Sequence, residues 1–218
     1  YQQGWGVEKN LVVALRWFRR AAGQGLPRAC FELGNAYCLG HGVAADPAEG
    51  VRWLRLAIDG GHAMAACNLG YLYLHGQGVP RDVALAMHNY ERGAKLGSVE
   101  ALAELGVLYA TAEAEGLQPD PARAFALYQQ AAERGSVKAM HLLGFAYERG
   151  KGVEPNEALA RRWYRRAAER GDGAAASRLA ELLLAGLGGP PDPSGAAHWL
   201  ERGVAANDPR AEGALGAL

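Results

Sequence analysis

The sequence has few cysteines and no long apolar run. The three cysteines among its 218 residues, Cys30, Cys38 and Cys67, cannot all pair within one chain, and their spacing matches no standard metal motif. No apolar stretch approaches the roughly 20 residues that span a bilayer. These features argue against a disulfide-built scaffold and against direct membrane insertion.

Neither sign of charge is in excess, since 23 Lys and Arg residues face 23 Asp and Glu residues. This balance argues against bulk electrostatic attraction to nucleic acid or to a membrane surface. Arginines do recur along several segments, for example Arg161, Arg162 and Arg165, and they could support a nucleic-acid hypothesis. Because acidic residues are interspersed with them, a solvated outer face is the favoured interpretation, and nucleic acid is not an expected partner.

Recognisable catalytic motifs are also missing. No Ser/His/Asp or Cys/His constellation is visible, and the Gly-x-Gly pairs follow expected helices, whereas a dinucleotide fingerprint must follow a strand. The segment from Cys38 to His41, with His75 one repeat later, suggests a metal site, but a small buried thiol and loop histidines are the favoured interpretation. The sequence therefore predicts no enzyme activity, no cofactor and no metal.

What the sequence does contain is one unit repeated along its length. A Leu-Gly pair recurs every 36 to 38 residues, with Leu179 and Ala180 in the one register that lacks the glycine. Self-similarity at this period is typical of a solenoid of helical hairpins. The pairs are Leu33 and Gly34, Leu69 and Gly70, Leu105 and Gly106, Leu143 and Gly144, and Leu215 and Gly216.

Residues 136–171 show what each unit encodes. Apolar residues at helical spacing precede Gly150, which ends a first helix, and Asn156 is a good N-cap for a second helix that Gly171 closes. The N-cap register reads Asn10, Asp46, Asp82, Asp120, Asn156 and Asp192, and the closing register reads Gly25, Gly61, Gly97, Gly135, Gly171 and Asn207. We therefore expect an all-α chain.

Two further registers predict packing. A mid-helix glycine costs about 1 kcal/mol of helix propensity, so the glycines of the Leu-Gly pairs are predicted to mark close crossings of paired helices. The aromatic side chains Trp17, Trp53, Trp163 and Trp199 share another register. Aromatics at helical spacing are usually core residues, and we expect these four to be buried.

The repeat boundaries predict a single solenoid over residues 1–218. The expected divisions are a partial repeat at 1–25, full repeats at 26–61, 62–97, 98–135, 136–171 and 172–207, and a partial repeat at 208–218. Because neither end has the polar capping repeat that solenoids need, we expect a piece of a longer protein. The loops at 111–117 and 186–193 depart from the pattern, for which drift in a tolerant loop is the favoured explanation.

The combined pattern resembles a known family. Ala-x3-Leu-Gly-x2-Tyr, then Gly-x-Gly-Val, Asp or Asn, Ala-x2-Trp-Tyr-x2-Ala-Ala and a final Gly is similar to the Sel-one-like repeat, a branch of the tetratricopeptide superfamily. The resemblance implies a right-handed α-α superhelix of antiparallel helix hairpins, with first helices lining a concave groove. It also implies non-catalytic adaptors and scaffolds that bind proteins or peptides.

The resemblance also bears on the compartment. Some secreted bacterial members carry a disulfide between a second helix and the next first helix, and here the matching positions are Ala22 with Cys30 and Ile58 with Ala66. Because these pairs are absent, the unpaired cysteines favour the cytoplasm, and the bacterial cell envelope is the family-based alternative.

Groove positions are assigned by analogy with tetratricopeptide arrays. They vary between repeats while the framework does not, as a surface tuned for a partner would, although they could equally be the solvent positions of the first helices. The predicted anchors for an extended peptide or a partner helix are Tyr71, Phe145, Asn35 and Arg149, which would act through apolar contacts and backbone hydrogen bonds. The candidate binding residues are Phe31, Asn35, Tyr71, His75, Val107, His141, Phe145, Arg149 and Glu181.

The sequence thus predicts a non-catalytic scaffold or adaptor that binds a protein or peptide. The alternative is an interaction arm of a larger enzyme, or of a membrane-anchored envelope protein, whose active domain lies outside residues 1–218. Self-association through the open ends of the solenoid is a further expectation.

Overall fold

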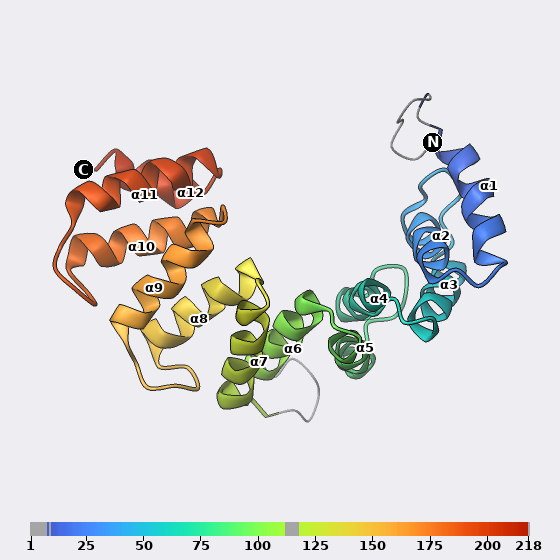
Figure 1. Cartoon of the computed structure of the whole chain (residues 1–218), viewed down its shortest axis with the longest axis horizontal. Coiled ribbons are helices and arrows are strands. Elements are labelled where there is room, and N and C mark those ends of the chain that lie inside the picture. The colour runs from blue at the N-terminus through green and yellow to red at the C-terminus, as the bar shows by residue number, and fades with distance from the viewer. Residues whose placement is uncertain (1–7, 9, 112–117, 218) are drawn as a thin grey trace. The chain divides into compact units, whose positions relative to one another are not determined.

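The computed structural model describes residues 8, 10–111 and 118–217. Within them, twelve α-helices and no strand are found, which confirms the prediction of an all-α chain (Figure 1). The helices are α1 (Leu11–Ala22), α2 (Pro27–Leu39), α3 (Pro47–Asp59), α4 (Ala63–His75), α5 (Val83–Lys95), α6 (Val99–Thr111), α7 (Pro121–Glu133), α8 (Val137–Arg149), α9 (Glu157–Ala168), α10 (Gly173–Ala185), α11 (Pro193–Ala205) and α12 (Pro209–Leu215).

Contacts divide the chain into two compact units, residues 1–101 and 102–218. Within the first unit, α1 packs on α2, α2 on α3, α3 on α4 and α4 on α5. Within the second, each helix from α7 to α12 likewise packs on the next one, and α10 also contacts α12. Both units are therefore built from hairpins of consecutive helices, as a repeat solenoid requires.

Every second helix begins at its predicted N-cap. Asn156, for example, accepts a hydrogen bond from the amide of Leu159 at 2.9 Å, which satisfies one of the orphan N–H groups of the first turn. The same bond forms at Asn10, Asp46, Asp82, Asp120 and Asp192.

The predicted closing positions are confirmed as well. All six have positive φ, and five of them are glycine, for which this conformation carries no steric cost. The sixth is Asn207, with φ 58°, and asparagine is among the few other residues that tolerate the left-handed region. Each second helix therefore ends in the same turn.

A backbone hydrogen bond closes the loop inside each hairpin. The amide of Asn156 donates to the carbonyl of Tyr147 at 2.8 Å, and the amide of Asp192 donates to Leu183 at 2.9 Å. The bond recurs from Asp46 to Tyr37, from Asp82 to Tyr73 and from Asp120 to Tyr109. This bond fixes where the second helix starts relative to the first.

The glycines of the Leu-Gly pairs lie at the predicted helix crossings. A Cβ on Gly34 would meet Leu54 at 2.7 Å, and a Cβ on Gly70 would meet the ring of Tyr90 at 2.8 Å. Gly106 faces Tyr128 and Gly144 faces Tyr164 in the same way. Glycine is needed here because the second helix places a large side chain directly against the first helix.

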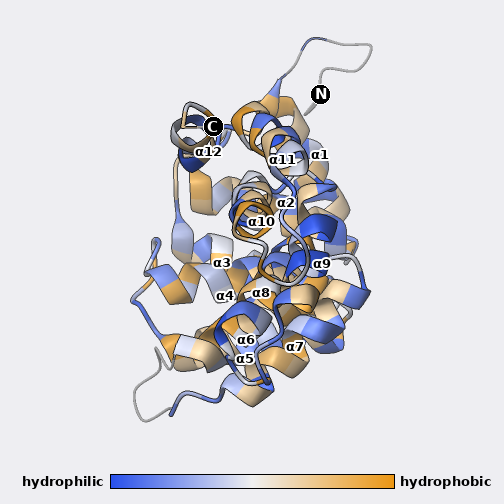
Figure 2. Cartoon of the chain, turned by 90° about the vertical axis from the view of Figure 1, so that its left-hand side faces the viewer, coloured by the Kyte–Doolittle hydropathy of each residue, from blue (hydrophilic) through white to orange (hydrophobic). Residues whose placement is uncertain are grey.

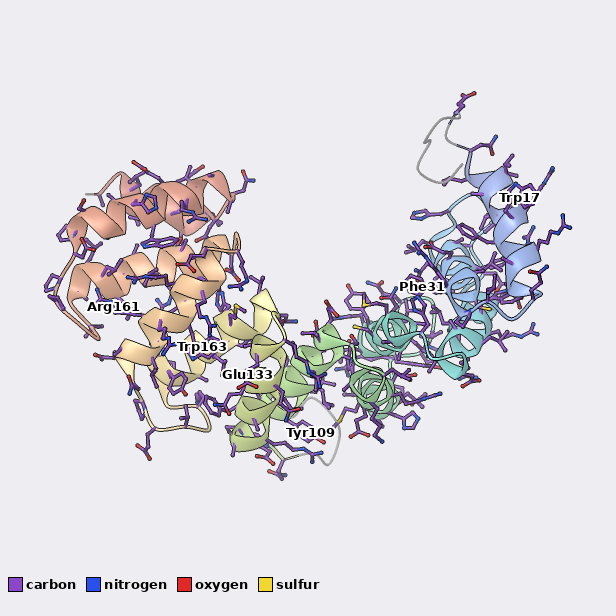
Figure 3. The ribbon with its side chains drawn as sticks, in the orientation of Figure 1. Trp17, Phe31, Tyr109, Glu133, Arg161 and Trp163 are labelled. Atoms are coloured by element: carbon purple, nitrogen blue, oxygen red, sulfur yellow. The ribbon has the colours of Figure 1, made fainter. Side chains whose placement is uncertain are left out.

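The tryptophan register is only partly buried, so the expectation of four core residues was wrong. Trp199 is buried and Trp53 is half-buried; of the two that Figure 3 labels, Trp163 is half-buried and Trp17 is 57% exposed. Trp17 belongs to α1, which no described helix precedes, and its ring is contacted by the Arg20 guanidinium at 6.0 Å. Alanine, leucine and tyrosine form most of the core instead.

Hydropathy distinguishes the two sides of the helices. In Figure 2, apolar and polar residues lie on different sides of most helices, and much of α9 is hydrophilic. Of the two irregular loops, 186–193 belongs to the described part of the chain, whereas positions 112–117 of the other lie outside it, as do residues 1–7 of the partial repeat at 1–25.

Candidate binding surface on the first helices

The nine predicted binding residues all lie on first helices, namely α2, α4, α6, α8 and α10. Every one of them is at least partly accessible to solvent, and the two apolar anchors stand out because Tyr71 is 46% exposed and Phe145 is 43% exposed. Large rings held in water on a helix surface are candidate contacts for a partner.

In the first unit, the predicted residues contact neighbours on α4. The ring of Phe31, labelled in Figure 3, stacks on His62 with centroids 4.4 Å apart. His62 is also the N-cap of α4, and burial lowers the pKa of its imidazole, although Glu32 acts in the opposite direction. Tyr71 lies 4.3 Å from His75 on the same helix.

A pocket of about 210 Å³ lies between α2 and α4. The structure brings Asn35 and Tyr71 together there, and Asn35 accepts a hydrogen bond from the side chain of Asn68 at 3.0 Å. Phe31 and His75 do not line this pocket. The complete lining is Asn35, Cys38, Leu39, Asn68, Tyr71, Leu72 and Gln77.

A larger pocket, of about 460 Å³, lies in the second unit among α6, α7 and α8. Two of the predicted residues, Val107 and Phe145, line it from α6 and α8, and the buried ring of Tyr128 lines it from α7. Burial, together with the charge of Glu104, raises the pKa of Tyr128 to about 12, so the hydroxyl stays neutral. The remaining lining is mostly apolar: Ala110, Thr111, Pro119, Pro121, Ala124, Leu142, Ala146 and Lys151.

Next to this pocket, the structure connects predicted residues through partners that sequence reasoning missed. Arg149 and Glu181 do not contact each other directly, but both join a network centred on Glu148, whose side chain is 13% exposed. Glu148 accepts from the Tyr164 hydroxyl at 2.8 Å and pairs with Arg178, which also pairs with Glu181.

Burial and the neighbouring Glu148 carboxylate both raise the pKa of Tyr164, so its hydroxyl remains a donor. Glu148 and Glu181 also raise the pKa of Arg178, against the opposing effect of its burial. The network therefore holds its charges in fixed positions along α8 and α10.

His141 contacts Asp172, the N-cap of α10. The Nδ1 atom lies 3.1 Å from Oδ1, and the same carboxylate accepts from the amide of Ala175 at 2.8 Å. Burial acts to raise the pKa of Asp172, but the hydrogen bonds from His141 and the helix amide outweigh it and hold the pKa below its ordinary value. His141 lies on α8, and Asp172 stands between α9 and α10. The contact therefore joins the start of the next hairpin to the first helix of the hairpin formed by α8 and α9.

The missed partners share a recognisable spacing. Asn68 lies 33 residues after Asn35, Lys138 lies 34 residues after Glu104, and Arg178 lies 30 residues after Glu148. Each pair joins neighbouring first helices within one unit. Complementary polar residues about one repeat apart are thus the signal that would have found them.

No group of three or more His, Cys, Asp or Glu side chains in the described part of the chain could hold a metal ion. Among the helices that the structure describes, none has the length and apolar character needed to cross a membrane.

Comparison with known families accounts for the repeats. The model of the Sel1 repeat matches six times, at residues 1–26, 27–62, 63–98, 99–136, 137–172 and 173–208. The chain belongs to the Sel1 repeat family. Sel1 repeat proteins are generally protein-interaction scaffolds and typically non-catalytic. No curated protein matches this chain.

Solved structures show the same fold. A Sel1 repeat protein from Oxalobacter formigenes is 34% identical with a TM-score of 0.82, and the match covers 93% of this chain and 80% of that one. The protective antigen c5321 of uropathogenic Escherichia coli, which has an SLR fold, is 31% identical with a TM-score of 0.87. That match covers 99% of this chain but only 46% of the antigen.

A more distant structure is the immunity protein Pa5087 from Pseudomonas aeruginosa. It is 22% identical with a TM-score of 0.58, and the match covers 93% of this chain and 76% of that one. At this identity the likeness concerns the fold alone. Together with the helix pairing, these structures establish an all-α solenoid of Sel1 repeats.

Proposed function

We propose that this Sel1 repeat chain is a non-catalytic scaffold that binds a protein or peptide through the exposed surface of its first helices. The observation that carries the proposal is the apolar pocket of about 460 Å³ whose rim holds Phe145 and Val107. Its size suits one large side chain of a partner, and its lining offers few polar groups to perform chemistry.

The pocket has the character of a site for an anchor residue. Phe145 is 43% exposed, and Leu142, Ala146 and Tyr128 line the same pocket with it. Filling such a pocket with an apolar side chain removes water from both surfaces, which gains about 25 cal/mol for each Å² buried. Thr111 and Lys151 can orient the partner's backbone at the edge.

Specificity would come from the polar side chains beside the apolar contacts. Arg149 and Glu181 are both exposed, and the network through Glu148 and Arg178 holds them in place. Preorganised charges discriminate between partners more than they add affinity. In the first unit, Asn35 and Tyr71 line one pocket and likewise place a polar side chain beside an apolar ring.

The proposal is tested by selecting peptides from a random library on the wild-type chain and measuring their affinity for variants. We expect Phe145→Ala with Val107→Ala to weaken binding of selected peptides at least about tenfold, as the loss of an interface anchor does. Tyr71→Ala should weaken peptides that use the first unit. Circular dichroism checks that helicity is kept.

Trp17→Ala is the matched control, because Trp17 is an exposed aromatic side chain on a second helix. Its removal should leave the affinity unchanged. Normal affinity after both Tyr71→Ala and Phe145→Ala would show that the first-helix surface is not the binding site.

A further inference from the structure

Another hollow, of about 340 Å³, lies among α9, α10 and the loop before α11, and it has a different character. Arg161, Arg162 and Arg165 line it from α9, and the irregular loop before α11 lines the other side. The loop contributes Gly188, Pro190 and Asp192. Drift alone was the favoured explanation for this loop, but the structure places it against three guanidinium groups.

The loop is held by one of those arginines. Arg161, labelled in Figure 3, donates to the carbonyl of Pro190 at 3.3 Å. Its guanidinium also lies so close to Gly189 that a Cβ there would meet Nη1 at 2.5 Å. A Cβ on Gly188 would meet the backbone nitrogen of Ala158 on α9 at 2.6 Å. Glycine at 188 therefore allows the loop to come within reach of α9, and the hollow has a defined wall.

Arg165 lacks the partner that its counterparts have. Arg19 donates to the hydroxyl of Tyr37 at 2.8 Å, and Arg55 donates to that of Tyr73 at 3.1 Å. In each case the tyrosine follows the arginine by 18 residues.

Eighteen residues after Arg165 stands Leu183, which also lines the hollow. A leucine in place of the tyrosine lacks both the hydroxyl acceptor and the aromatic ring. With leucine at position 183, Arg165 therefore has no tyrosine hydroxyl to bond and lies beside the open space of the hollow.

Among the described residues that line the hollow, three arginines face one carboxylate, so positive charge is in excess. Arg161, Arg162 and Arg165 form no ion pair there, in contrast to Arg52 with Glu49 and Arg92 with Asp59 in the first unit. The one acidic residue in the lining, Asp192, caps α11 by accepting from the amide of Gly195 at 2.8 Å.

We propose that this hollow binds the carboxylate side chains of an acidic segment of a protein partner. Guanidinium groups match carboxylates in planar, bidentate hydrogen bonds, and such charge-assisted bonds are the strong ones. A carboxylate here would take the place that the tyrosine hydroxyl takes beside Arg19 and Arg55.

A protein carboxylate is favoured over a nucleic-acid phosphate by charge and shape. The chain has no net charge, with 23 basic and 23 acidic residues, so it lacks the field that draws nucleic acid to a protein. The site is also a hollow with a loop as its wall, which suits single side chains, whereas a nucleic-acid backbone follows an extended basic groove.

The test measures binding of a fluorescein-labelled oligoglutamate peptide by fluorescence polarisation at about 150 mM salt, where exposed charges are screened. Saturable binding to the wild-type chain is expected. Arg162→Gln with Arg165→Gln should lower the affinity about tenfold or more, since each loses a charged hydrogen bond. Leu183→Tyr should also weaken binding while leaving the charge unchanged, because it refills the space and occupies Arg165.

The matched control is Arg166→Gln with Arg170→Gln, which removes the same charge from the last turn of α9 and the turn that follows it, outside the hollow. It should bind the peptide nearly as the wild type does, and so should Phe145→Ala, which alters only the first-helix surface. Circular dichroism of every variant checks folding.

Three outcomes would overturn the proposal. They are no binding of oligoglutamate to the wild type, an equal loss in the matched control, and tighter binding of single-stranded oligothymidylate with the same dependence on Arg162 and Arg165. The last result would assign the hollow to phosphate instead.

Discussion

The Cα atom of Gly144 lies directly against the ring of Tyr164 where α8 crosses α9. A Cβ at this position would meet Cδ1 of the ring at 2.6 Å and Cε1 at 2.7 Å. The ring is fully buried, and its hydroxyl donates to Glu148. The ring therefore cannot move aside without losing both its packing and its hydrogen bond.

We accordingly predict that Gly144→Ala destabilises the protein. Alanine would gain about 1 kcal/mol of helix propensity, but overpacking a filled core costs about 1–3 kcal/mol. The steric cost exceeds the gain in helix propensity, because three atoms of the Tyr164 ring would lie within 2.8 Å of the new Cβ. A net loss of about 1–2 kcal/mol should appear in urea denaturation followed by circular dichroism.

Gly213→Ala is the control for this prediction, because nothing lies within 4 Å of a Cβ at that helical position. It should be neutral or stabilising. A Gly144→Ala protein as stable as the wild type would show that the crossing can widen without cost.

The crossing glycines, the N-caps and the closing turns were all predictable from the sequence, because each is a local signal repeated in one register. Asn156 and Gly171, for instance, satisfy backbone groups whatever the neighbouring repeat contains. The burial of Trp17 was predicted wrongly, since exposure depends on whether another helix covers that face. The arrangement of all repeats in one continuous array stays a prediction.

The candidate site was predictable only in outline. Helical spacing placed Val107 and Phe145 on first helices, and the structure brings both to one pocket. The partners Glu148 and Arg178 could not be foreseen, because their pairing depends on how two hairpins lie against each other. The hollow at Arg165 follows from the absence of a tyrosine hydroxyl at position 183, which only the contacts of the other repeats reveal.

A second prediction concerns the hydrogen bond between Tyr164 and Glu148. Glu148→Gln keeps an acceptor for the hydroxyl but removes the charge that faces Arg178. Since Glu148 is mostly buried, we expect a loss of about 1–2 kcal/mol. Tyr164→Phe should lose about 1 kcal/mol.

A double-mutant cycle measures the coupling between these two positions by urea denaturation. Non-additive losses are expected, because the Tyr164 hydroxyl and Arg178 share one carboxylate. Strictly additive losses would mean that the two side chains act independently. Arg52→Gln is the control, since the Arg52 side chain is 77% exposed and its ion pair with Glu49 should contribute little.

A third prediction concerns acid stability. The pKa of Asp172 is lower in the folded protein than its ordinary value of 3.8. The carboxylate therefore contributes stability fully above pH 3.8, and this contribution is lost as the pH falls through the lower folded value. Asp172→Asn keeps an N-cap but removes the charge.

We expect the Asp172→Asn variant to be less stable than the wild type near neutral pH, with the difference shrinking as the pH falls below about 4. Thermal unfolding at several pH values measures it. Asp192→Asn provides a control on an exposed N-cap that has no histidine partner. A difference that grows on acidification would contradict the assignment.

The last prediction concerns the reactivity of Cys38. Burial raises the pKa of its thiol from 9.0 to about 11, and only the thiolate is nucleophilic. At a pH of about 8, the thiolate fraction is therefore roughly a hundredfold smaller than for an ordinary cysteine. Iodoacetamide should label Cys38 slowly in the folded protein, with a rate that rises about tenfold per pH unit. Tandem mass spectrometry separates this site from Cys30.

Unfolding in urea should restore an ordinary rate of labelling at Cys38. Equal rates before and after unfolding would show that the thiol is not shielded by the contact between α2 and α3.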